Sequence, residues 1–82
     1  MAVPVLVKAS MDAYVNQKML PGSFLMAVLC NDLTKSVGYA DSTNLAALPD
    51  IVRYVYNELP GNCWGNEDKV YKWVANSLYA VK

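Results

Sequence analysis

The sequence predicts an all-α fold, a small bundle of four helices, and three observations indicate it. Apolar residues recur at helical spacing along most of the chain. Proline and glycine fall between the apolar segments, where such residues end helices. The length of 82 residues is that of one domain, so we expect a single helical domain over residues 1–82.

The first expected helix covers residues 4–18. Pro4 suits its first turn, because proline has a helical backbone angle and the N–H that it lacks has no partner there. Met11, Tyr14 and Val15 follow at the spacing of one helix face. Valine occupies every second position of residues 3–7, so a short strand at the beginning is the alternative.

The second expected helix covers residues 23–37, with Ser23 as its N-cap and Gly38 as a left-handed cap at its end. Its first half, residues 24–30, is apolar around the whole circumference, and such a helix must be covered on all sides. In so small a domain we expect another copy of the chain, or the target, to cover the back of this helix. The candidate interface residues are Phe24, Met26 and Leu29.

The third expected helix follows the capping residues Asp41 and Asn44 and ends at Glu58. One face holds the apolar residues of this segment, which are Leu48, Ile51, Val52 and Val55. Pro49 interrupts the segment, because proline lacks an N–H and its ring clashes with the carbonyl four residues back. We therefore expect this helix to be kinked or broken at Pro49.

The fourth expected helix has the clearest pattern. Asn66 is its N-cap, and Glu67 and Asp68 place negative charge at the positive end of the helix dipole. An apolar stripe then continues at helical spacing to Val81.

Composition excludes several classes of function. The chain has no histidine, so it has no histidine general base and no histidine metal ligand. Two cysteines are too few for a zinc site built from cysteine and histidine, and no glycine-rich phosphate-binding motif occurs. We therefore expect no enzyme activity, no catalytic residue, no metal and no cofactor. Cys30 and Cys63 are expected to pack as free thiols, with a disulfide as the less favoured alternative.

Charge and hydropathy indicate the kind of partner. Seven Lys+Arg balance seven Asp+Glu, so the net charge is zero, and charged residues make up 17% of the chain against 55% hydrophobic. Zero charge argues against binding to duplex nucleic acid, and the longest apolar run, residues 24–30, is too short to span a membrane. Apolar content beyond what a small domain can bury predicts a homo-oligomer. With no signal peptide, we expect a cytoplasmic protein.

Five residues are candidates for binding a ligand or a partner. Asn31 and Asp32 follow the apolar run directly, and Asp32 has the alternative of bonding a backbone N–H or a lysine at the rim of the bundle. Asn57, beside Tyr56, ends the third helix near the loop that contains Trp64. Trp64 either plugs the end of the bundle or offers a stacking platform to a partner.

Several stretches together resemble a family of short, uncharacterised bacteriophage and prophage proteins. The matching stretches, within residues 10–75, include Pro-Gly-Ser-Phe-Leu-Met-Ala-Val-Leu-Cys-Asn-Asp-Leu (21–33), Gly-Tyr-Ala-Asp (38–41), Tyr-Asn-Glu-Leu-Pro (56–60) and Cys-Trp-Gly (63–65). The proline at position 49 departs from the larger apolar residue of the family pattern. The resemblance implies a phage origin and a compact helical domain in the cytoplasm of the host cell.

Small phage proteins of this class often block a host function, including antiviral defence. We therefore expect a non-enzymatic accessory protein that acts by binding, either covering a host protein or sequestering a small nucleotide signal. The alternative is a structural or assembly module whose oligomer interface is its whole function.

Overall fold

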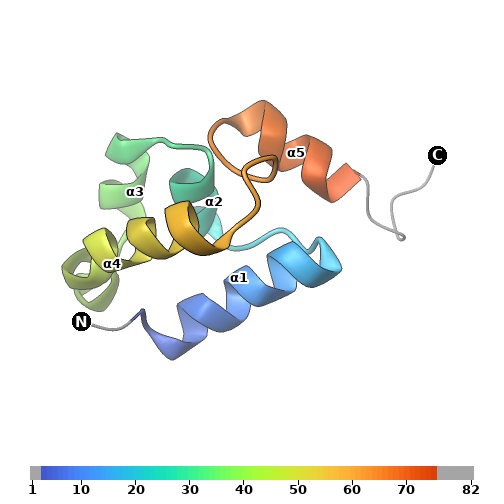
Figure 1. Ribbon diagram of the computed structural model, residues 1–82. Helices are drawn as coiled ribbons and strands as arrows, with labels where there is room; N and C mark the ends of the chain where they lie inside the picture. Colours follow the sequence, from blue (N-terminus) through green and yellow to red (C-terminus); the bar gives the residue numbers. More distant parts are fainter. Residues whose placement is uncertain (1–2, 76–82) are drawn as a thin grey trace.

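The computed structural model describes residues 3–75, which form five α-helices joined by short loops (Figure 1). The helices are α1 (Val5–Gln17), α2 (Ser23–Leu29), α3 (Leu33–Tyr39), α4 (Ser42–Glu58) and α5 (Glu67–Ala75). The all-α class is confirmed for this part of the chain, and the alternative of a strand at its beginning is wrong, because Val5 and Val7 lie in α1. The end of the fourth expected helix, after residue 75, lies outside the described residues.

The helix expected over residues 23–37 is two helices, so the bundle of four helices is corrected to five in the described range. Asn31 ends α2 with a left-handed backbone (φ 62°), which asparagine tolerates better than most residues. Asp32 is then the N-cap of α3, since its Oδ1 accepts a hydrogen bond from the backbone N–H of Lys35 at 3.1 Å. The expected caps are also corrected: Gly22 occupies the N-cap of α2, and Gly38 lies inside α3.

The helix α4 passes Pro49 without a break, although a kink there stays a prediction. Because Pro49 has no N–H, the carbonyl of Leu45 lacks its hydrogen bond within the helix. Leu45 and Pro49 are both exposed, so water can hydrogen-bond to this carbonyl. The expected cap is confirmed, because Asp41 Oδ1 accepts a hydrogen bond from Asn44 N–H at 2.8 Å. At α5, Asn66 Oδ1 likewise accepts from Lys69 N–H at 2.8 Å.

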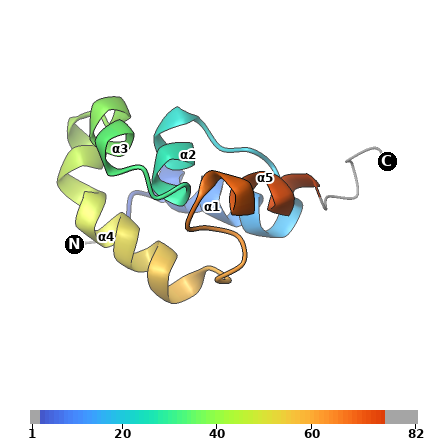
Figure 2. The same cartoon turned by 90° about the horizontal axis from the view of Figure 1, so that it is seen from above.

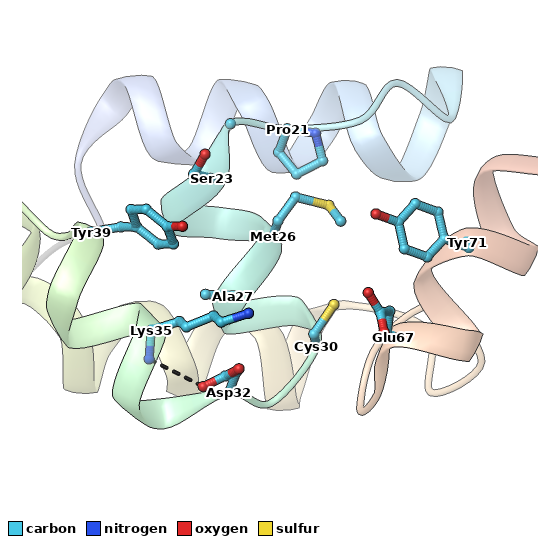
Figure 3. A pocket seen from close by; sticks show the side chains of 11 residues that line it. Pro21, Ser23, Met26, Ala27, Cys30, Asp32, Lys35, Tyr39, Glu67 and Tyr71 are labelled. Carbon is cyan, nitrogen blue, oxygen red and sulfur yellow. Dashed lines mark hydrogen bonds between the residues drawn. The ribbon is translucent and has the colours of Figure 1, made fainter.

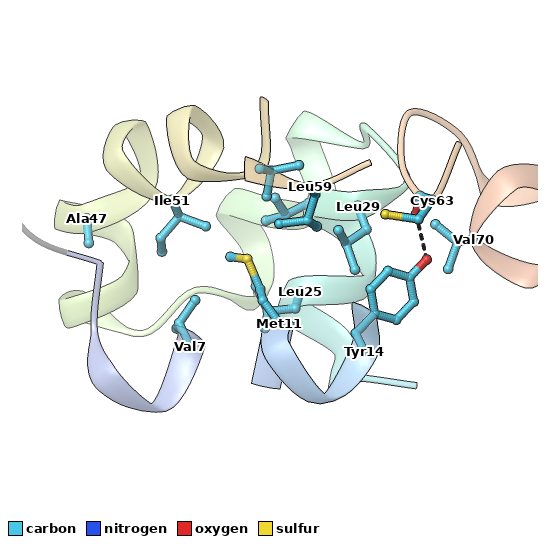
Figure 4. Close-up of a cluster of buried hydrophobic side chains, with 12 residues drawn as sticks. Val7, Met11, Tyr14, Leu25, Leu29, Ala47, Ile51, Leu59, Cys63 and Val70 are labelled. Carbon is cyan, nitrogen blue, oxygen red and sulfur yellow. Dashed lines mark hydrogen bonds between the residues drawn. The ribbon is translucent and has the colours of Figure 1, made fainter. Parts of the chain in front are cut away.

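The core lies between α1 and α4, with α2 inserted between them (Figure 4). Val7 and Met11 of α1 point toward Ile51 of α4, and Leu25 and Leu29 of α2 fill the space between. Figure 2 shows that α2 also lies between α3 and α5, which it contacts. Leu25, Ala27, Val28 and Leu29 of α2 are therefore buried within one chain, while Phe24 and Met26 are half-buried.

Hydrogen bonds with α1 and α2 hold the loop after α4 and the helix α5 that follows it. The buried hydroxyl of Tyr14 donates to the carbonyl of Cys63 at 2.6 Å, and Trp73 Nε1 donates to the carbonyl of Tyr14 at 3.0 Å. Gly65 N–H donates to the Leu29 carbonyl at 2.8 Å, with a φ of 123° that favours glycine. These bonds fix the loop and the position of Trp64 within it. Within residues 3–75, no helix is long and apolar enough to cross a membrane.

Candidate partner-binding surface

The helix α4 has two apolar stripes. The inner stripe, Ala47, Ile51 and Val55, is buried in the core. The outer stripe consists of Leu45, Pro49, Val52 and Tyr56, and all four residues are exposed. The outer residues are spaced by four, three and four positions, so they form one line along the helix. Val52, expected on the buried face, is 47% exposed, which corrects that prediction.

The outer stripe forms one wall of an apolar cavity of about 620 Å³, which we call the outer groove. Leu48 and Arg53 of α4, Leu33 of α3 and Trp64 of the loop complete its lining. Leu33 is 71% exposed and Tyr56 is 72% exposed, although both are large apolar or aromatic side chains. Among the described residues, Arg53 is the one charged residue of the groove lining, and its Nη1 pairs with Asp50 Oδ1 at 3.1 Å. The groove is therefore suited to an apolar ligand surface.

Trp64 lies where the outer groove meets the core. Its ring packs against Tyr56 in an edge-to-face arrangement, with centroids 6.2 Å apart and planes at 71°. Its Nε1 is buried and has no hydrogen-bond partner among residues 3–75, which is uncommon for an indole in a protein interior. Because Trp64 is half-buried against the core and also lines the groove, it acts as a plug and as part of the exposed wall.

A second, polar hollow of about 480 Å³ lies between α2, α3 and α5 (Figure 3). Tyr39 and Tyr71 point their hydroxyls inward from opposite sides, toward Met26. Burial raises the pKa of the Cys30 thiol, the carboxylates of Glu67 and Asp32 raise it further, and Lys35 lowers it. The thiol is therefore protonated at neutral pH and is a poor nucleophile.

The structure brings together four of the five predicted binding residues. Tyr56 and Trp64 meet at the outer groove. Asn31 and Asp32 line a recess of about 180 Å³ that shares Trp64 with the outer groove. Asp32 also caps α3, the alternative considered for it. Asn57 is exposed and lies outside the lining of the groove.

Only Tyr56 and Trp64 of the groove lining were among the predicted binding residues; the others are Leu33, Leu45, Leu48, Pro49, Val52 and Arg53. The spacing of Leu45, Pro49, Val52 and Tyr56 is visible in the sequence, but Ile51 and Val55 supply a competing apolar face on the same segment. No pattern on α4 points to Leu33, because the connection from α3 to α4 brings it to the groove.

The predicted oligomer interface on the second helix is only partly available. Leu29 is 0% exposed within one chain, so it cannot contact a second copy, and that prediction is wrong. Phe24 and Met26 are half-buried and pack against the core. The physical reason is the length of α2, seven residues, which its neighbouring helices can surround.

The two cysteines are free, and Cys63 is buried in the core with its Sγ bonded to the Pro60 carbonyl. In the described part of the chain, no group of three or more histidine, cysteine or acidic side chains could hold a metal ion. The strongest feature is thus a surface for non-covalent contact. Comparisons with protein-family models, with curated proteins and with solved structures give no match to the chain.

Proposed function

We propose that the chain is a non-enzymatic accessory protein of bacteriophage type that acts by binding a host protein through the outer groove. The observation that supports this proposal is the group of exposed apolar side chains, Leu33, Leu45, Val52 and Tyr56, around one apolar cavity. Contiguous apolar surface of this kind marks interaction sites on small proteins. The phage origin and the inhibitory role in the host cell rest on the family resemblance of the sequence.

A protein ligand fits the groove better than a nucleotide does. Phosphate groups need several cationic or N–H donors, and the groove offers the single side chain of Arg53, which is paired with Asp50. The polar hollow is no better, because it sets the carboxylates of Asp32 and Glu67 against one ammonium group, that of Lys35. Apolar and aromatic side chains around a groove are instead typical of a surface that binds a protein segment.

Photo-crosslinking during expression in a bacterial host tests the proposal. A photoreactive phenylalanine analogue at position 56 is expected to label one host protein, which mass spectrometry identifies. The control is the same analogue at Tyr39, which is 56% exposed on α3 but lines the polar hollow. Leu33→Glu should abolish the labelling at position 56.

Two results would overturn the proposal. One is equal labelling of host proteins from positions 56 and 39, because the groove then has no selectivity. The other is a thermal shift with a panel of nucleotides that Leu33→Glu leaves unchanged, together with no labelling at position 56. That combination would favour nucleotide sequestration at a different site.

A further inference from the structure

The outer stripe of α4 has the residue spacing of a helix–helix contact. Leu45, Pro49, Val52 and Tyr56 follow one another by four, three and four residues, the spacing with which the apolar seam of a coiled coil repeats. The stripe extends along α4 from near its beginning to near its end. A helix with the same apolar spacing is therefore a natural occupant of the outer groove, and α4 of a second copy is such a helix.

The surface also has the shape that self-association requires. In a two-fold dimer the same patch of both chains meets itself, so the patch must contain a projecting part and a hollow part. Tyr56 stands at the wall of the outer groove and is 72% exposed, so it is the side chain that a second copy would meet first, and the remaining apolar lining is the surface that it would pack against. Tyr56 of one chain can thus enter the groove of the other while receiving the same contact in return.

The exposed area is of the right order for a reversible contact. Tyr56 offers on the order of 150 Å² of side-chain surface, and Leu33, Leu45 and Val52 each add roughly 50–100 Å². A dimer of standard size buries about 800 Å² per chain, more than half of it apolar. The groove residues supply a large share of that apolar area, so the contact is expected to form at high concentration and to dissociate on dilution.

Charge does not oppose this contact. The net charge of the chain is zero, so there is no net electrostatic repulsion between two copies. Arg53, the charged residue in the groove lining, keeps its partner Asp50 on the same helix. Closing the groove over this pair leaves no unpaired charge inside the interface. The contact therefore avoids the large cost of burying a charged side chain without a partner.

We propose that a second copy of the chain occupies the outer groove and forms a two-fold dimer in which the two α4 helices lie antiparallel. The axis passes beside Pro49 and Val52, at the middle of the stripe. A host protein that binds the same groove then displaces the second copy. The dimer goes beyond the proposed function, because the groove can bind a host protein whether or not the free chain dimerises.

Sedimentation equilibrium of the purified chain, from ~10 μM to ~1 mM, tests the dimer. The native chain is expected to change reversibly from monomer to dimer across this range, and Tyr56→Lys to stay a monomer. Tyr39→Lys, the matched control on the polar hollow, should dimerise as the native chain does. Circular dichroism confirms that both variants keep their helical content.

Each other outcome of the sedimentation overturns the dimer. A native chain that stays monomeric throughout the range shows that the groove does not bind a second copy. If Tyr56→Lys still dimerises, the contact lies on another face, such as that of Phe24 and Met26. The same conclusion follows if Tyr39→Lys alone fails to dimerise.

Disulfide cross-linking gives an independent test that does not depend on a destabilising charge. Position 52 lies beside the proposed axis, so oxidation of Val52→Cys is expected to form a disulfide between the two copies of this cysteine. Leu6→Cys, at an exposed position of α1 outside the groove, is the control, and both variants retain Cys30 and Cys63. A covalent dimer formed as readily by Leu6→Cys, or by neither variant, would contradict the proposed arrangement.

Discussion

The inner and outer stripes of α4 contain similar residues in opposite surroundings. Ile51 and Val55 are covered by α1 and α2, whereas Val52 and Leu45, on the same helix, are each 47% exposed. A helix can be apolar on both sides, but a domain of this size has enough other helices to cover one of them. The difference teaches that the buried stripe specifies the fold and that the exposed stripe is available for binding.

The largest expected effect is a difference between the two stripes in their contribution to the free energy of unfolding. Ile51→Ala should lower the free energy of unfolding by about 2–5 kcal/mol, because it leaves a cavity in the core. Val52→Ala, one residue further along, removes a side chain that is half in solvent, so its cost should be below about 1 kcal/mol. Urea denaturation at low protein concentration measures both. Equal losses would show that the two stripes are not distinct.

The next effect concerns the hydrogen bond that holds the loop beside the groove. Tyr14→Phe leaves the buried Cys63 carbonyl without its donor and should lower the free energy of unfolding by about 1–3 kcal/mol. Tyr71→Phe, at an exposed position, is the control and should have little effect. If the two variants unfold at the same urea concentration, the bond between Tyr14 and Cys63 does not stabilise the fold.

The same tyrosine predicts a dependence on pH. Burial raises the pKa of Tyr14 in the folded chain, and Cys63 and Cys30 raise it further. The fold therefore favours the protonated phenol, and that stabilisation is complete below the unfolded pKa of about 10 and is lost as pH rises above it. The difference in unfolding free energy between the native chain and Tyr14→Phe should shrink above pH ~10. A difference that stays constant to higher pH would contradict the assignment.

A smaller effect tests the role of Asp32 as a cap. Asp32→Ala should lower the free energy of unfolding by about 1 kcal/mol, because the first turn of α3 loses its bond to Lys35 N–H. Asp32→Asn keeps a capping oxygen and should remain within a few tenths of a kcal/mol of the native chain. Thermal unfolding measures both variants. Equal destabilisation by the two would indicate that the charge of Asp32, and not its cap, stabilises this region.

The smallest expected effect is on the groove itself. Leu33→Glu replaces an exposed side chain in the first turn of α3, where negative charge is favourable, so the free energy of unfolding should change by less than about 0.5 kcal/mol. The same variant removes apolar area from the groove and should weaken dimerisation. A large loss of stability would assign Leu33 to the fold and not to binding.

The sequence predicted what depends on local chemistry. Helical periodicity indicated the all-α class, and the caps Asp41 and Asn66 were found because a capping side chain bonds within its own segment. The division of the second helix was missed, although Asn31 and Asp32 are turn and cap residues, because the apolar run before them is a stronger pattern. The local signal was present, but continuity of hydrophobicity outweighed it.

The candidate surface depends on contacts distant in sequence, and there the prediction was less complete. Trp64 and Tyr56 were predicted as binding candidates, which stays a prediction, and the structure brings their rings into contact. The packing of the five helices buries much of α2 and leaves one side of α4 exposed. This packing cannot be read from the sequence of any single segment. The interface predicted at Leu29 was wrong for this reason.

A dilution series followed by two-dimensional ¹H–¹⁵N NMR tests the central claim most directly, because it reports on the two stripes of α4 separately. Between ~1 mM and ~10 μM, the amide signals of Leu45, Val52 and Tyr56 should shift with concentration, while those of Ala47, Ile51 and Val55 shift much less. Shifts that centre on Phe24 and Met26, or the absence of any shift, would contradict the claim that a second copy of the chain occupies the outer stripe of α4.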